Sequence, residues 1–325
     1  MTEVAIIGAG MAGLAAAERL RANGVACVLF DKSRGVRGRM STRRAGDLQF
    51  DHGAQYFTAR GPAFIAQVAR WREAGLVGEW TPEHFVGTPG MTAPARAMAA
   101  SHECVTGAQV SRLSRGADGW SVCDEKGLVA APGNGAYRAV ILAVPAPQAI
   151  PLAASAGARW PALADVSYAP CIALMLAFPP DTPCDAGDGL RPDDSVVAWI
   201  ARNSSKPGRP AIAQTWVVHA RPDWSRAHLE QDVESLRAPL LSSFRSITGI
   251  DAEPIHASAH RWRFALVEKP LGAPCLFDET LMLGACGDWC LGPRVEAAYD
   301  SGCGMAATLL LSLNGAVSRR NFGPI

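Results

Sequence analysis

The chain has 325 residues, of which 49% are apolar and 19% are charged, so it can build a substantial core and is not a disordered chain. Its length favours two domains or one large divided domain. The 31 basic and 30 acidic residues leave a formal charge of +1, which gives no electrostatic reason to expect nucleic acid or an anionic membrane as a partner. The basic residues are 27 Arg and only four Lys, a bias that reflects either codon usage or guanidinium groups that bind phosphate.

The first 31 residues have the pattern of a parallel βαβ unit. Residues 4–7 form an apolar run that favours a strand, residues 11–20 show helical spacing, and residues 26–30 favour a second strand that ends at Asp31. The sequence GAGMAG at residues 8–13 fits G-x-G-x-x-G between strand and helix, where glycines allow the backbone to approach a pyrophosphate. We therefore expect a dinucleotide site in which Asp31 accepts hydrogen bonds from ribose hydroxyls. Its other residues are Gly8, Gly10, Ala12 and Gly13.

The rest of the chain alternates between helical and strand patterns. We expect a helix at 62–75, a β meander over 105–129, a buried strand at 137–145, a helix near 226–247, a strand at 281–285 and a helix from 295 to about 313. Between them, half-apolar strand candidates at 170–178, 195–201, 211–219 and 254–263 indicate a second, sheet-based domain.

The nine cysteines are odd in number and include no Cys-x-x-Cys pair, which predicts reduced thiols in a cytoplasmic protein. Cys286 and Cys290, four residues apart, would serve either redox chemistry or the core. The N-terminal sequence lacks the basic region of a signal peptide, and the longest apolar stretch, 139–149, is interrupted by two prolines. We expect no signal peptide and no membrane span.

Two segments favour FAD over NAD as the bound dinucleotide. The loop at 32–40 resembles the G-G-R loop of the glutathione-reductase and amine-oxidase flavoproteins, with Gly38 and Arg39 matching its last two residues and Arg37 standing where the first glycine is usual. Asp288 follows Gly287 as in the G-D motif of these flavoproteins, where the Asp contacts the ribityl chain or pyrophosphate; it could instead cap a helix. Further expected FAD contacts are Lys32, Met40, Gly53, Ala54, Gln55, Val295 and Val110, the last of which could equally be a core residue.

Five segments, at 39–44, 51–60, 199–207, 260–263 and 287–296, resemble those of the bacterial renalases. The resemblance implies non-covalent FAD in an amine-oxidase-like fold. It also implies an oxidase that converts dihydro isomers of NAD(P), reduced at the wrong nicotinamide carbon or held in the wrong anomer, into β-NAD(P)+. Hydride would pass to flavin N5, and dioxygen would take the electrons to give hydrogen peroxide.

The same segments supply the candidates for the substrate site. Tyr56, Trp199, His260 and Trp262 are the candidate catalytic residues, with Tyr56 and Trp262 shaping the pocket over the flavin. His260 could also be purely structural. Arg202, Asn203 and Arg263 are candidates for binding a substrate phosphate or ribose.

Two other functions remain open. A flavin amine oxidase usually carries a lysine on a strand of its substrate domain, and the comparable stretch here, 168–174, has none; Lys206 and Lys269 stand in proline-containing loop sequences. A non-catalytic flavin or nucleotide sensor is the second alternative. Turnover would distinguish it from an enzyme.

We therefore predict an α/β fold in which a Rossmann-type parallel sheet binds FAD and is interrupted by a mixed-sheet substrate domain. The FAD-binding domain would comprise residues 1–60, 97–160 and 272–325, and the substrate domain residues 61–96 and 161–271. The cofactor would lie between them.

Overall fold

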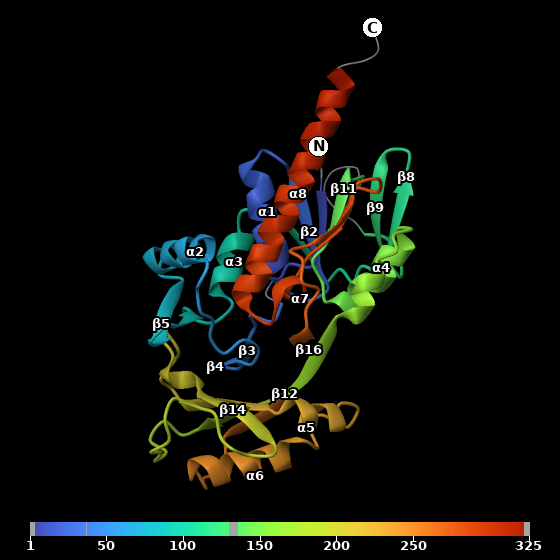
Figure 1. Ribbon diagram of the computed structural model, residues 1–325. Coiled ribbons are helices and arrows are strands. Elements are labelled where there is room, and N and C mark those ends of the chain that lie inside the picture. Colours follow the sequence, from blue (N-terminus) through green and yellow to red (C-terminus); the bar gives the residue numbers. More distant parts are fainter. Residues whose placement is uncertain (1–3, 37, 130–135, 322–325) are drawn as a thin grey trace.

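The computed structural model describes residues 4–36, 38–129 and 136–321 (Figure 1). Its first layer is a six-stranded sheet in the order β17–β18–β11–β1–β2–β7, in which only the edge pair β17–β18 is antiparallel. The strands are β1 (Val4–Ile7), β2 (Cys27–Asp31), β7 (Glu103–Thr106), β11 (Ala139–Leu142), β17 (Leu276–Asp278) and β18 (Leu283–Ala285).

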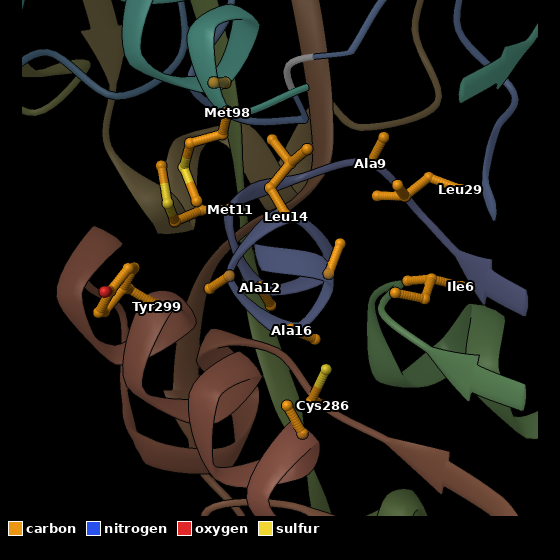
Figure 2. Packing of buried hydrophobic residues seen from close by; sticks show 14 of the residues in the cluster. Ile6, Ala9, Met11, Ala12, Leu14, Ala16, Leu29, Met98, Cys286 and Tyr299 are labelled. Carbon is orange, nitrogen blue, oxygen red and sulfur yellow. The ribbon is translucent and has the colours of Figure 1, made fainter. Parts of the chain in front are cut away.

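Helices cover one face of this sheet. Alternation in β1 sends Val4 and Ile6 to that face, where they share a core with α1 (Met11–Ala22), α2 (Pro62–Glu73), α3 (Ala93–Ala99) and α8 (Val295–Asn321). In Figure 2, α1 lies between Met98 of α3 and Tyr299 of α8. A Cβ on Gly302 would lie 2.1 Å from the Ala12 carbonyl oxygen, so α1 and α8 pack closely enough to require glycine.

The opposite face carries a smaller cover. Ala5 and Ile7 point into a second core, formed with Leu113, Trp120 and other residues of a three-stranded sheet and of a helix. These elements are β8 (Arg112–Gly116), β9 (Gly119–Asp124), β10 (Gly127–Leu128) and α4 (Ala146–Ser155).

A five-stranded antiparallel sheet forms the other half of the molecule (Figure 1). Its order is β13–β14–β15–β12–β16, and its outer face packs against α5 (Pro222–Ala227) and α6 (Arg237–Thr248) through a core that includes Ile172 and Phe244. The strands are β12 (Ser167–Phe178), β13 (Gly189–Leu190), β14 (Val197–Arg202), β15 (Gln214–Ala220) and β16 (His256–Lys269). Near its end β16 places Val267 in the core of the parallel sheet, so this long strand joins the two halves.

Short elements fill the space between the sheets. The hairpin of β3 (Thr42–Ala45) and β4 (Leu48–Asp51) packs Phe50 against Met175 and Val217 on the inner face of the second sheet. The others are the hairpin of β5 (Val77–Thr81) and β6 (His84–Gly87), the 3-10 turns η1 (Pro161–Asp165) and η2 (Asn203–Ser205), and α7 (Asp288–Leu291).

The α/β architecture predicted from the sequence is confirmed: a parallel Rossmann-like sheet is accompanied by separate antiparallel sheets. The helix expected near 226–247 is wrong in its first half, because Ser235 hydrogen-bonds to the carboxylate and the carbonyl of Asp232 and forms a turn there. The division into domains remains a prediction. None of its boundaries cuts a strand. Helix α2, which was assigned to the substrate domain, packs beside α8 in the core of the parallel sheet. Among the described residues, no helix has the length and apolar character needed to cross a membrane.

Candidate active site

One large cavity lies between the two sheets and has a volume of about 2290 Å³. A single drug-sized ligand usually occupies roughly 300–1,000 Å³, so this cavity has room for a cofactor and a second large ligand. It is lined by most of the residues predicted from sequence: Gly8, Gly10, Ala12, Asp31, Lys32, Gly38, Arg39, Met40, Gly53, Ala54, Gln55, Tyr56, Val110, Trp199, His260, Trp262, Arg263, Asp288 and Val295. Gly13, Arg202 and Asn203 are not part of its lining.

At one end, the glycine-rich turn after β1 opens directly into the cavity. A Cβ on Gly8 would lie 2.4 Å from the Ala143 carbonyl oxygen, and one on Gly13 would lie 2.0 Å from the Gly8 carbonyl oxygen, so both positions require glycine. A Cβ on Gly10 would meet only the Gly38 Cα, at a contact distance of 3.9 Å, and a Cβ on Gly38 would lie 3.2 Å from the Gly10 Cα, so the two glycine loops approach each other closely. Because no described side chain caps the first turn of α1, its backbone N–H groups are available to a phosphate.

Asp31 closes the turn from the end of β2. Its carboxylate accepts hydrogen bonds from the backbone N–H groups of Ala9 at 2.9 Å and Ser33 at 2.8 Å. These bonds hold the glycine turn against the next loop while Asp31 still lines the cavity. The position suits an acceptor for ribose hydroxyls.

Arg39 and Asp288 connect three parts of the chain. Their side chains form an ion pair at 2.6 Å, and Arg39 also donates to the carbonyl oxygens of Phe264 and Ala265 at 3.3 Å. The N-cap of α7 is Gly287, so Asp288 is an ion-pair partner in the first turn of the helix. The Arg39 carbonyl in turn accepts from Ala54 N–H at 2.9 Å, and a Cβ on Gly53 would lie 2.0 Å from that oxygen.

The other end of the cavity is floored by the antiparallel sheet. One row of paired residues crosses four strands: Trp199 on β14 is opposite His219 on β15, His219 is opposite Ala173 on β12, and Ala173 is opposite His260 on β16. Trp262 stands two residues further along β16. The sequence patterns did not single out His219, because its significance lies in the pairing of strands that are distant in the chain.

Aromatic groups stand on two sides of this floor. On one side His260 lies 4.6 Å from Trp262 and 4.8 Å from His52, measured between ring centroids. Burial, together with the nearby Arg43, lowers the pKa of His260 to about 4, so its ring is neutral at physiological pH.

On the other side, Tyr56 stacks on His84 with centroids 3.9 Å apart and lies 5.7 Å from Trp199. The Arg191 guanidinium is 4.7 Å from the Trp199 ring and donates to the Tyr56 hydroxyl at 2.7 Å. A protein cation therefore already occupies the face of Trp199.

A buried charge cluster beside the cavity lining consists of Asp51, Lys206 and Arg209. The Asp51 carboxylate forms an ion pair with Arg209 and lies 3.7 Å from the Lys206 ammonium, and all three side chains are fully buried. Lys206 also donates to Gln55 Oε1 at 3.2 Å, which links the cluster to the cavity lining. Burial lowers the pKa of Lys206 to about 8, with Asp51 opposing the change.

Comparison of the chain with known protein families agrees with this arrangement. Residues 66–310 match the model of the family described as flavin containing amine oxidoreductase, and residues 6–70 match an NAD(P)-binding Rossmann-like domain. The chain belongs to the flavin-containing amine oxidoreductases. The predicted amine-oxidase fold and the predicted FAD cofactor are thereby confirmed, and the glycine turn in the cavity wall, together with the uncapped start of α1, fits the pyrophosphate of FAD.

Solved structures show the same fold at low identity. A structure from Exiguobacterium sp. 255-15, provisionally named a protoporphyrinogen oxidase, has a TM-score of 0.75 at 12% identity over 96% of this chain and 99% of that one. Cyclohexylamine oxidase from Brevibacterium oxydans IH-35A has a TM-score of 0.68 at 13% identity over 96% and 99%. Putrescine oxidase bound to putrescine has a TM-score of 0.69 at 15% identity over 95% and 99%.

Three predicted substrate-binding residues of this flavin amine oxidoreductase have protein partners. Arg202 donates to the Ala186 carbonyl at 2.7 Å, and the Asn203 side chain bonds the backbone of Gln49 and Asp51. Arg263 lines the cavity edge but pairs with Glu230 at 2.6 Å. Arg202 and Asn203 thus brace β14 and β4, and their substrate role stays a prediction.

Cys286 and Cys290 are buried in the two cores on either side of the parallel sheet. Burial raises the pKa of Cys290 to about 12 and that of Cys286 well above its usual value. Both are therefore protonated thiols at physiological pH, which favours the core role over redox chemistry.

Proposed function

We propose that this flavin amine oxidoreductase is an oxidase of dihydro-NAD(P) isomers, α-NAD(P)H and 2- or 6-dihydro-NAD(P). The overall reaction would consume one dihydro isomer, one proton and dioxygen, and yield β-NAD(P)+ and hydrogen peroxide. Bound FAD would supply the hydride acceptor and react with dioxygen.

The charge of the cavity lining is the observation that carries the proposal. Among the described residues it comprises eleven basic side chains and two carboxylates, Asp31 and Asp288. Both carboxylates already have protein partners at the FAD end. A dinucleotide with two phosphates suits such a lining, whereas an ammonium substrate would meet repulsion and no free carboxylate.

Size and shape support the same substrate class. The volume of about 2290 Å³ leaves space for a second dinucleotide beside FAD. The groups that would flank a flat nicotinamide ring are aromatic, and His260 is neutral. Hydride transfer requires the two rings to be oriented face to face and needs no ionised base, so these residues would act by positioning.

Amine oxidation is the second candidate, because the family and the named neighbours include amine oxidases. Two features weigh against it. The strand β12 carries no lysine, and Arg191 lies on the face of Trp199, where an ammonium group would otherwise find a cation–π contact.

Anaerobic mixing tests the proposal. We expect purified protein to be yellow, to release free FAD on denaturation, and to lose its flavin colour rapidly with α-NADH or 2- or 6-dihydro-NAD. β-NADH and simple amines should bleach it slowly or not at all. Rapid bleaching by putrescine or cyclohexylamine, with none by the isomers, would refute the proposal in favour of amine oxidation, and a bleached flavin that stays bleached in air would refute the oxidase step.

The remaining expectations concern location and partners. All nine cysteines are free thiols, which supports a reducing, cytoplasmic environment. The expected partners are a nicotinamide dinucleotide and dioxygen.

A further inference from the structure

His219 occupies the centre of the cavity floor, between the two groups of aromatic residues. It lies on β15 between Trp199 and Ala173, lines the cavity and remains partly accessible from it. The Ala173 side chain ends at Cβ, so on that side no large group separates His219 from His260. A planar ligand held between the aromatic walls would pass over the His219 ring.

The hydrogen bonds of Gln55 determine which end of its side-chain amide faces the His219 ring. Lys206 Nζ lies 3.2 Å from Gln55 Oε1, and because an ammonium group can only donate, that atom is the amide oxygen. Gln55 Nε2 is then the NH2 group. Its two N–H groups go to the backbone carbonyls of Asp51 at 2.5 Å and Gly53 at 2.9 Å.

These bonds decide which His219 nitrogen carries the proton. His219 Nε2 lies 3.3 Å from the Gln55 NH2 group, whose N–H groups are already used, and 3.1 Å from the His52 carbonyl oxygen. A carbonyl can only accept, so Nε2 carries the hydrogen and donates it to His52. The same oxygen also accepts from Trp262 Nε1 at 2.9 Å, which fixes it in place.

Nδ1 is consequently a lone-pair acceptor. It has no hydrogen-bond partner among the described residues, and it is the ring nitrogen that remains for a ligand in the cavity. Burial, and to a lesser extent the charge of Lys206, lower the pKa of His219 to about 4, so protonation does not remove this acceptor at physiological pH.

We propose that His219 is a specificity-determining residue whose Nδ1 accepts a hydrogen bond from an N–H donor carried by a substituent of the substrate ring. The identity of that donor rests on the proposed function: in a dihydronicotinamide it is the NH2 group of the carboxamide. A site built around an acceptor discriminates against an analogue that lacks the donor, because the buried acceptor then stays unpaired.

The tautomer can be tested without any substrate. Holoenzyme labelled with 15N at histidine would be recorded by long-range 1H–15N correlation at pH 7.5, with His219 assigned by the signals lost in His219→Gln. We expect the pattern of a neutral ring protonated at Nε2. A ring protonated at Nδ1, or an imidazolium, would overturn the inference whatever the substrate is.

The substrate test compares a dihydro isomer of NAD with the same isomer of 3-acetylpyridine adenine dinucleotide, in which a methyl group replaces the amide NH2. We expect wild-type protein to prefer the carboxamide by about tenfold in the ratio of rate to apparent dissociation constant for flavin reduction. His219→Gln should reduce that preference to about twofold or less, whereas His219→Asn, whose side chain reaches the Nδ1 position, should retain most of it. His256→Gln, on β16 of the same sheet and outside the cavity lining, is the matched control and should keep the wild-type preference.

The two failures are distinguishable. If neither isomer reduces the flavin of wild-type protein, the proposed function fails and the tautomer measurement still judges His219. If reduction is fast but His219→Gln keeps the tenfold preference, the proposed function stands and the role of His219 is refuted.

Discussion

Replacement of Lys206 by Met provides a direct test of the buried charge cluster. In the folded protein the pKa of Lys206 is about 8, against an ordinary value of 10.5. Between those pH values the unfolded chain binds a proton at this residue and the folded protein does not, so Lys206 makes the free energy of unfolding rise as pH increases from 8 to 10.5. At about 1.4 kcal/mol per pH unit, the charged side chain costs the folded state about 3 kcal/mol at neutral pH.

The substitution should be tolerated because it leaves a balanced pair. Asp51 keeps Arg209 as its partner, while Gln55 Oε1 loses the ammonium group, at a cost of about 1–3 kcal/mol. At pH 7 we therefore expect the free energy of unfolding of Lys206→Met to lie within about 2 kcal/mol of the wild-type value. Between pH 7 and pH 10.5 the difference, variant minus wild type, should fall by about 3 kcal/mol.

The assay is urea unfolding followed by tryptophan fluorescence, with saturating FAD and a reducing agent, at several pH values from 7 to 10.5. Cysteine and tyrosine titrations affect both proteins equally and cancel in the difference. Lys269→Met is the control, since Lys269 is exposed and forms only a 3.9 Å surface pair with Asp165. A difference between Lys206→Met and wild type that does not change with pH would refute the reasoning.

Three further predictions follow from other contacts. Asp51→Asn leaves Lys206 and Arg209 buried without a counter-charge, so we expect urea denaturation to show a loss of about 3–5 kcal/mol, part of which is restored in the double variant with Lys206→Met. Gly10→Ala adds a methyl group to the cavity wall where the backbone would approach the pyrophosphate, and should weaken FAD binding at least tenfold in a fluorescence titration; Gly116→Ala, where a Cβ meets nothing within 4 Å, should bind FAD normally. Because the pKa of His219 and of His260 is about 4 against 6.5, the unfolded chain binds more protons between those values, and stability should fall as pH drops from 6.5 to 4. His260→Gln should make that fall shallower in urea titrations, and an unchanged slope would argue that His260 is charged in the folded protein.

Features that depend on local sequence were predictable. The turn at 8–13 and the acid at Asp31 belong to one short unit in which Gly13 is required by a contact with Gly8, and Gly8 by a contact with Ala143 directly after β11, so their spacing was informative. The strands of the second sheet were visible as apolar runs for the same reason. Helix α4 was missed because Pro151 lies in its interior, where proline usually argues against a helix; Pro147, in the first turn, is compatible with one.

Features that depend on contacts between residues distant in the chain could not be predicted. Lys206 stands before Pro207 and Gly208, which correctly indicated a loop, but its burial follows from Asp51, 155 positions earlier in the chain. The role proposed for His219 arises only when β14, β15, β12 and β16 are in register. Arg202 was expected at a ligand because it lies in a renalase-like segment, yet its guanidinium donates to the carbonyls of Cys184 and Ala186 in an adjacent loop.

The interleaving of distant segments in the parallel sheet has a consequence for biosynthesis. The glycine turn is translated long before β18, at residues 283–285, which pairs with β11, and before α8, which begins at residue 295 and packs on α1. The FAD pocket therefore cannot be completed until β18 and the start of α8 have been translated. Until then α1 has only the earlier elements of its core, such as α2 and α3, to pack against, so we expect cofactor capture to come late in folding rather than at its beginning.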